Sequence, residues 1–164
     1  CGNLNLQLRR HQHLYMGRSE VAGGGVFIRE EVDKGEYIQE YTGEQMSWDE
    51  ADRRGKIYDR RNSSYIFNLN TTTVLDAMRK GNKTRFANHS QAPNCVARIM
   101  LAGGDHRIGI FARRRIDAGE ELFYNYMHDT FDVVPEWHEK LGSGGGRGGK
   151  RKAPSSGPNH PRAL

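Results

Sequence analysis

Residues 85–95 read Arg85-Phe86-Ala87-Asn88-His89-Ser90, then Gln91-Ala92, then Pro93-Asn94-Cys95. Taken alone, an Asn-His pair is more often a turn than a site, because most exposed loops carry no site. Downstream, residues 119–126 read Gly-Glu-Glu-Leu-Phe-Tyr-Asn-Tyr, a cluster that alone is more often core. Upstream, Gly23-Gly24-Gly25 lacks the strand-to-helix context of a dinucleotide fingerprint. Only the combination of the three stretches is informative.

The chain around these stretches is predicted to be mainly β, with one short helix. β-branched and aromatic residues between turn residues predict strands at Gly25–Ile28, Tyr37–Tyr41, Ser64–Leu69, Val96–Leu101, Arg107–Ala112 and Glu121–Tyr124. Ser47 and Glu50 fit a capping box, so a helix is expected from there to about Arg60. The strands are too short and too irregularly spaced for a βαβ repeat.

The composition indicates one domain without a membrane span. A chain of 164 residues is long enough for a core of its own. No apolar run approaches the roughly 18 residues that suggest a membrane helix, and the polar, basic N-terminal stretch predicts no secretory signal. Cys1 and Cys95 form no CxxC pair, so we expect no metal site and a reducing intracellular compartment.

The positive charge is concentrated at the C-terminal end. Of the 25 lysines and arginines, five lie in residues 142–164, where there is no acid. The remaining 20 balance the 20 aspartates and glutamates. This Gly-, Pro- and Ser-rich stretch is predicted to be disordered. Its Lys150-Arg151-Lys152 run suits weak contact with DNA phosphates or part of a nuclear-import signal, and a solvated linker is the alternative.

In their order along the chain, the motifs resemble the SET-domain protein-lysine methyltransferases. They are the glycine triplet, Glu40-Tyr41-Thr42-Gly43-Glu44, the stretch at 85–95 and the stretch at 119–126, and the resemblance covers about residues 12–128. Within that family, EADRRGKIYDR at 50–60, FNLN at 67–70, DAMRKGNKTRFANHS at 76–90 and GDHRIGIFA at 104–112 resemble the Enhancer-of-zeste type. The forms at 40–44 and 123–126 are more similar to the plant branch than to the animal branch.

The resemblance implies a division of the chain and a fold. Residues 1–11 would end a cysteine-rich pre-SET region, 12–128 would form the SET domain, 129–141 a post-SET extension and 142–164 the basic tail. The implied fold consists of small curved sheets with a C-terminal pseudoknot, in which the C-terminal segment passes through a loop. Such a fold would bring the stretches at 85–95 and 119–126 together.

The resemblance also implies an activity. The chain would transfer a methyl group from S-adenosylmethionine to a lysine of the histone H3 tail, by family lysine 27, without a metal. It would be the catalytic subunit of a nuclear Polycomb repressive complex that silences transcription. Its partners there would be an Extra-sex-combs-type WD-repeat protein and a Suppressor-of-zeste-type zinc-finger protein.

Site residues are carried over position by position. The implied lysine channel is formed by Tyr41, Phe67, Tyr124 and Tyr126, with Tyr126 and Tyr41 as catalytic residues. The implied cofactor site is formed by Gly23, Gly24, Gly25, Arg85, Phe86, Asn88, His89 and Tyr126. Aromatic rings suit a dry channel for an amine, and Asn and His side chains both donate and accept hydrogen bonds.

The sequence departs from the family pattern at three positions. Gly24 stands where the family has Trp, Asn125 where it has Asp, and Tyr124 where animal relatives have Phe. Gly24 supports one alternative, a catalytically impaired SET module that binds chromatin partners without turnover. A second alternative, a basic nucleic-acid-binding protein, is opposed by the neutral charge balance of residues 1–141.

Overall fold

The computed structural model describes residues 2–59 and 65–126. The expectations for Cys1, for the extension at 129–141 and for the basic tail at 142–164 lie outside the described residues.

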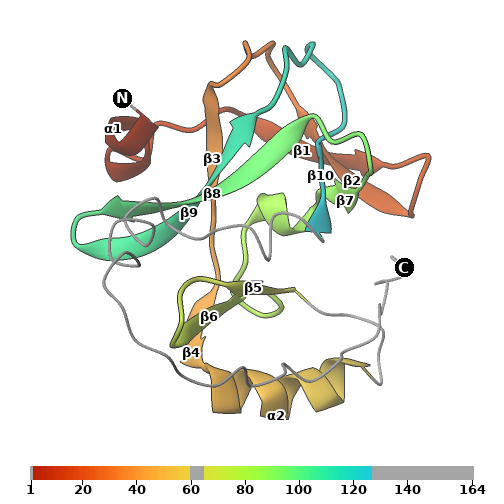
Figure 1. Ribbon diagram of the computed structural model, residues 1–164. Coiled ribbons are helices and arrows are strands. Elements are labelled where there is room, and N and C mark those ends of the chain that lie inside the picture. The colour runs from red at the N-terminus through yellow and green to blue at the C-terminus, as the bar shows by residue number, and fades with distance from the viewer. Residues whose placement is uncertain (1, 60–64, 127–164) are drawn as a thin grey trace, which may run out of the picture.

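Short antiparallel sheets dominate the described chain (Figure 1). The strands are β1 (Leu14–Arg18), β2 (Gly24–Ile28), β3 (Tyr37–Tyr41), β4 (Glu44–Ser47), β5 (Ile66–Asn68), β6 (Thr73–Asp76), β7 (Asn88–His89), β8 (Cys95–Ala102), β9 (Asp105–Ala112) and β10 (Phe123–Tyr124). The helices are α1 (Gly2–Gln7), α2 (Trp48–Asp59) and the 3-10 helix η1 (Lys83–Phe86). The prediction of a mainly β fold is confirmed, and α1 adds a short helix to the one expected.

One three-stranded sheet contains the two longest strands of the described chain. Its strand order is β3-β9-β8, and β8 and β9 make a hairpin paired from Cys95–Ala112 to Ala102–Asp105. In β9, the residues from Ile108 to Ala112 are all buried, because packed elements cover both faces of this part of the strand. In Figure 1 this hairpin lies against β3 near the centre of the view.

A second sheet, β4-β6-β5, carries α2 along one side (Figure 1). The helix begins after Ser47, whose Oγ accepts from the Glu50 N–H at 3.4 Å, as the capping box predicts. Asp76 on β6 is 1% exposed and accepts from the Tyr58 hydroxyl at 2.7 Å and from Arg54 Nη1 at 3.1 Å. This buried carboxylate therefore fixes α2 against the sheet.

The C-terminal segment is inserted between two parts of the chain that are distant in sequence. On one side it pairs with β2, where Leu122 N donates to Val26 O at 2.8 Å. On the other side β10 runs parallel to β7, with Phe123 opposite Asn88 and Tyr124 opposite His89. This arrangement matches the knot-like feature that the resemblance implied, and it unites the stretches at 85–95 and 119–126.

Asn94 holds the inserted segment in place. Its side chain is 1% exposed, donates to Glu121 O at 2.7 Å and accepts from Phe123 N at 2.7 Å. A buried amide that is satisfied on both ends is costly to replace, since an unpaired buried polar group costs about 1–3 kcal/mol. The Pro-Asn-Cys part of the motif thus has a structural role.

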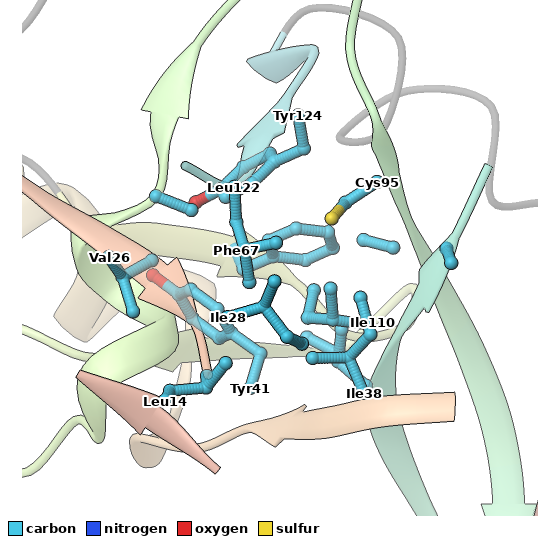
Figure 2. Close-up of a cluster of buried hydrophobic side chains, with 14 of the residues drawn as sticks. Leu14, Val26, Ile28, Ile38, Tyr41, Phe67, Cys95, Ile110, Leu122 and Tyr124 are labelled. Carbon is cyan, nitrogen blue, oxygen red and sulfur yellow. The ribbon is translucent and has the colours of Figure 1, made fainter. Parts of the chain in front are cut away.

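The hydrophobic core lies where these elements meet, and three of the residues expected to form the channel are part of it. Figure 2 shows Tyr41, Phe67 and Tyr124 among the aliphatic side chains of this cluster. Their exposed fractions are 3%, 3% and 6%. The aromatic residues singled out from sequence are therefore packed in the interior, from strands of three different sheets.

Candidate active site

The four aromatic residues expected to form a channel lie together. The rings of Tyr41 and Phe67 are 5.6 Å apart, and those of Tyr124 and Tyr126 are 4.8 Å apart. Tyr124 and Tyr126 both lie close enough to Tyr41 to influence the pKa of its hydroxyl. We call Tyr41, Phe67, Tyr124 and Tyr126 the aromatic cluster.

Two hydroxyls of the aromatic cluster donate hydrogen bonds to backbone carbonyls. The Tyr126 hydroxyl donates to Ala87 O at 2.7 Å, and the Tyr41 hydroxyl donates to Tyr65 O at 3.4 Å. Burial, with a smaller contribution from neighbouring tyrosines, raises the pKa of both hydroxyls well above the usual value for tyrosine. Both groups therefore stay neutral at physiological pH, and they are suited to orient a polar group and unsuited to accept a proton.

Arg85 lies near Tyr41 of the aromatic cluster and contacts two rings outside the cluster. Its Nη1 donates to Ala77 O and to Met78 O, each at 2.6 Å. Its guanidinium carbon lies 4.5 Å from the centre of the Phe86 ring and 5.5 Å from that of Tyr65. The side chain thus braces the rings through cation–π contacts.

A single strand next to the aromatic cluster, β7, carries the Asn-His pair. The ring of His89 lies 5.3 Å from that of Tyr126, and Nδ1 of His89 accepts from the Tyr126 N–H at 3.2 Å. The Asn88 side chain points the other way, since its Nδ2 lies 3.1 Å from Gly24 O. The structure therefore brings together the glycine triplet, the Asn-His pair and Tyr126, all expected at one cofactor site.

The glycine triplet is the end of a tight loop, residues 19–25, which we call the glycine loop. Ser19 N donates to Gly23 O at 3.1 Å, and Gly23 has a φ of 49°, which favours glycine. The Ser19 hydroxyl accepts from the backbone N–H groups of Val21 and Ala22 at 3.1 and 3.3 Å. A Cβ added at Gly24 would meet no atom within 4 Å.

Three polar residues of this region had no assigned role in the sequence analysis: Ser19, Asn94 and Glu121. Each is a polar residue within or near a recognised motif, and none has a local pattern that predicts its long-range partner. These long-range partners lie between 26 and 102 residues away in the chain. Only the fold reveals them.

A hollow of about 300 Å³ is lined by residues outside the aromatic cluster, among them Arg9, His11, Tyr37 and Asn82. Within residues 2–59 and 65–126 there is no group of three or more His, Cys, Asp or Glu side chains placed to hold a metal ion. No helix in the described part is long and apolar enough to cross a membrane.

The residues that form this site lie within a segment that matches a known protein family. The family described as "SET domain" matches residues 23–127. The chain belongs to the SET-domain family. The match contains the glycine triplet, all four members of the aromatic cluster and the Asn-His pair, so the family expectation from sequence is confirmed.

Relatives are found among plant histone-lysine N-methyltransferases. The chain is 56% identical over 140 residues to EZA1 of Arabidopsis thaliana, a match that covers 85% of this chain and 16% of that protein. It is 55% identical over 140 residues to CLF of Oryza sativa subsp. japonica, with the same coverage. The SET chain thus spans about a sixth of the length of these relatives. The expected similarity to the plant Enhancer-of-zeste type is confirmed.

Solved structures with the same fold belong to Polycomb assemblies. One, described as an active polycomb repressive complex 2 in the basal state, has a TM-score of 0.70 and 38% identity over 77% of this chain and 17% of that chain. Another, an autoinhibited complex bound to S-adenosylmethionine, has a TM-score of 0.68 and 36% identity over 80% of this chain and 16% of that chain. The expected SET fold is confirmed.

Proposed function

We propose that this SET domain transfers a methyl group from S-adenosylmethionine to a lysine amine of the histone H3 tail. The observation that carries the proposal is the convergence of the aromatic cluster, the Asn-His pair and the glycine loop at one place. Family membership and the relatives' activity support the same chemistry. Lysine 27 as the target is proposed from the resemblance alone.

The residues present suit the cofactor. The glycine loop leaves open space at Gly24, where an added Cβ would have no neighbour within 4 Å. His89 lies beside Tyr126, and the neutral imidazole has one donor and one acceptor nitrogen. We assign the holding of the cofactor to Gly23, Gly24, Gly25, Asn88, His89 and Tyr126, with Arg85 and Phe86 as bracing residues.

The chemistry follows from the surroundings of the lysine. When bound, S-adenosylmethionine supplies a methyl group on a sulfonium, whose sulfur leaves as a neutral thioether. The aromatic cluster strips water from the incoming amine, and this lowers the pKa of the amine and favours the nucleophilic neutral form. The neutral hydroxyls of Tyr41 and Tyr126 orient the amine in line with the methyl group, an effect worth several kcal/mol.

The most direct test of the cofactor assignment is calorimetry. S-adenosylmethionine is titrated into the chain, with the Tyr126→Phe and His89→Ala variants as comparisons. We expect saturable binding by the wild type and weaker binding by His89→Ala. A wild type that does not bind would favour the alternative, a SET module that recognises chromatin partners without turnover.

The cellular setting is proposed from the relatives. We infer that the chain acts in the nucleus within a Polycomb-type complex that represses transcription, with a WD-repeat partner of the Extra-sex-combs type and a zinc-finger partner of the Suppressor-of-zeste type. The chain spans about a sixth of its relatives, so the partner-binding regions are expected elsewhere in such a protein. The isolated chain should therefore methylate histone peptides weakly or not at all.

A further inference from the structure

The carboxylate of Glu121 joins the glycine loop to the Asn-His motif. Its Oε2 accepts from the Ser19 hydroxyl at 3.0 Å, and its Oε1 accepts from Asn88 Nδ2 at 2.8 Å. Asn88 Nδ2 also lies 3.2 Å from the Ser19 oxygen. Ser19 and Asn88 are 7% and 9% exposed, so this triangle of polar groups is largely shielded from water.

Backbone hydrogen bonds to β2 fix the position of Glu121 beside the glycine loop. Glu121 forms an antiparallel bridge with Phe27, and the flanking Ile28 N–H donates to Glu120 O at 3.0 Å. The carboxylate then fills the space beside Gly25, where an added Cβ would lie 2.2 Å from Oε1 and 3.1 Å from the Ser19 Cβ. A side chain at position 25 would therefore have to displace the carboxylate from its place beside Ser19.

The two consecutive glutamates of the motif have different surroundings. Glu120 pairs with Arg114, whose side chain is 56% exposed. In the described part of the chain, no ion pair joins Glu121 to a lysine, arginine or histidine, and its two side-chain partners are the neutral donors Ser19 and Asn88. Glu121 is thus placed to organise hydrogen bonds rather than to neutralise a cation.

We propose that Glu121 is a positioning residue that holds the glycine loop in the shape required for the methyl donor. It acts through Ser19, whose hydroxyl caps the turn at Val21 and Ala22, and through Asn88, which also bonds Gly24 O. The network orders the loop even though Gly24 provides no side chain to pack. This inference rests on the proposed function, which places the donor on this loop.

A double-mutant cycle tests the proposal in the full 164-residue chain. Glu121→Gln, Ser19→Ala and the double variant are titrated with S-adenosylhomocysteine, the stable demethylated product. Glu121→Gln is expected to weaken binding about tenfold, equivalent to about 1.4 kcal/mol. Adding Ser19→Ala to it should weaken binding by less than a further twofold, because both changes break one network. Glu31→Gln, at an exposed ion pair with Arg115, is the matched control and should bind like the wild type.

A second readout does not depend on the cofactor. Amide hydrogen exchange at residues 19–25 should be faster in unliganded Glu121→Gln and Ser19→Ala than in the wild type, with unchanged protection in the β8–β9 hairpin. Wild-type affinity and wild-type exchange in Glu121→Gln would overturn the proposal, as would strictly additive losses. If Glu121→Gln fails to fold, Ser19→Ala decides by the same two measurements. A wild type that binds no ligand, with the exchange result as expected, would refute the proposed function and leave the loop network standing.

Discussion

The backbone N–H of Tyr126 donates a hydrogen bond to Nδ1 of His89 across 37 positions of the chain. An amide N–H can only donate, so Nδ1 is the acceptor, and a neutral His89 carries its proton on Nε2. The bond couples the ring expected to contact the cofactor to the backbone of the residue expected to orient the amine. His89 is therefore expected to influence both the binding of the cofactor and the position of Tyr126.

Replacing His89 separates these roles. His89→Ala should weaken S-adenosylmethionine binding by about 1–3 kcal/mol, the usual cost of losing a buried polar partner. His89→Asn should lose less, because its amide oxygen can take the place of Nδ1 and keep the bond to Tyr126. Calorimetry on both folded variants measures the difference. Unchanged affinity in His89→Ala would mean that the cofactor lies elsewhere.

Tyr124 should limit the number of methyl groups added. Its side chain is 6% exposed and its ring lies 4.8 Å from that of Tyr126, so a water bound to its hydroxyl would occupy space that a growing methylammonium needs. Tyr124→Phe should raise the trimethylated share of product, read by mass spectrometry. Tyr15→Phe, at an exposed ring stacked on Phe27, is the control. An unaltered product distribution would assign the limit to another residue of the aromatic cluster.

Gly24→Trp should strengthen the cofactor site. A buried Trp contributes roughly 200 Å² of aromatic surface, worth several kcal/mol at about 25 cal/mol per Å². Since a Cβ at this position meets nothing within 4 Å, the substitution starts without a clash. In a reconstituted complex we expect tighter S-adenosylmethionine binding and faster methylation. Unchanged or blocked binding would show that this loop is built around glycine.

The neighbouring glycine serves as the steric comparison. Gly25→Ala would place a Cβ 2.2 Å from Glu121 Oε1, so it should destabilise the fold by about 1–3 kcal/mol, as overpacking usually does. Gly24→Ala should change stability by no more than about 0.5 kcal/mol, the range of an unobstructed position. Urea unfolding of the two variants gives both values.

Stability should fall in alkaline solution because tyrosines are buried. Burial, assisted by the charge of Glu40, raises the pKa of Tyr37 to about 12, and the pKa of Tyr41 and Tyr126 is also raised. An unfolded tyrosine loses its proton near pH 10 while the folded one keeps it, so stability is complete below pH 10 and declines above it. Tyr37 alone accounts for about 1.4 kcal/mol of this decline by pH 11, which is one pKa unit of the shift.

The free energy of unfolding measured at pH 8, 10 and 11 checks this pH dependence. Tyr37→Phe should have a shallower decline than the wild type over the same interval. Equal slopes for the two proteins would indicate that the Tyr37 hydroxyl titrates normally in the folded state.

Local sequence pattern predicted the strands whose burial gives a clear apolar signal. The expected strands near β2, β3, β8 and β9 agree with the structure to within two residues, because their β-branched and aromatic residues face the core. β1 gave no such signal, since Leu14 is its one buried residue. β10 lies within the strand expected at Glu121–Tyr124, so that prediction is confirmed. β7 was not predicted, because it is two residues long and is a strand only through its pairing with β10.

The sequence motifs predicted some residues of the candidate site and missed others. Motif resemblance identified the aromatic cluster and the Asn-His pair, whose convergence the structure then displays. It did not assign Glu121 a role, because a glutamate in a turn-and-strand motif is usually solvated and its partner Ser19 lies 102 positions away. The orientation of Asn88 toward Gly24 likewise depends on packing that sequence spacing does not encode.

Methyl transfer can be measured in a reconstituted complex, with an H3 tail peptide and S-adenosylmethionine, followed by mass spectrometry. The wild type should methylate a lysine of the peptide. Tyr126→Phe should transfer methyl groups at least about tenfold more slowly, equivalent to about 1.4 kcal/mol in the barrier, while binding the cofactor within about twofold of the wild type. A wild type that binds the cofactor and modifies no lysine would refute methyl transfer by this SET domain, and a Tyr126→Phe variant with the full rate would refute the role of the Tyr126 hydroxyl.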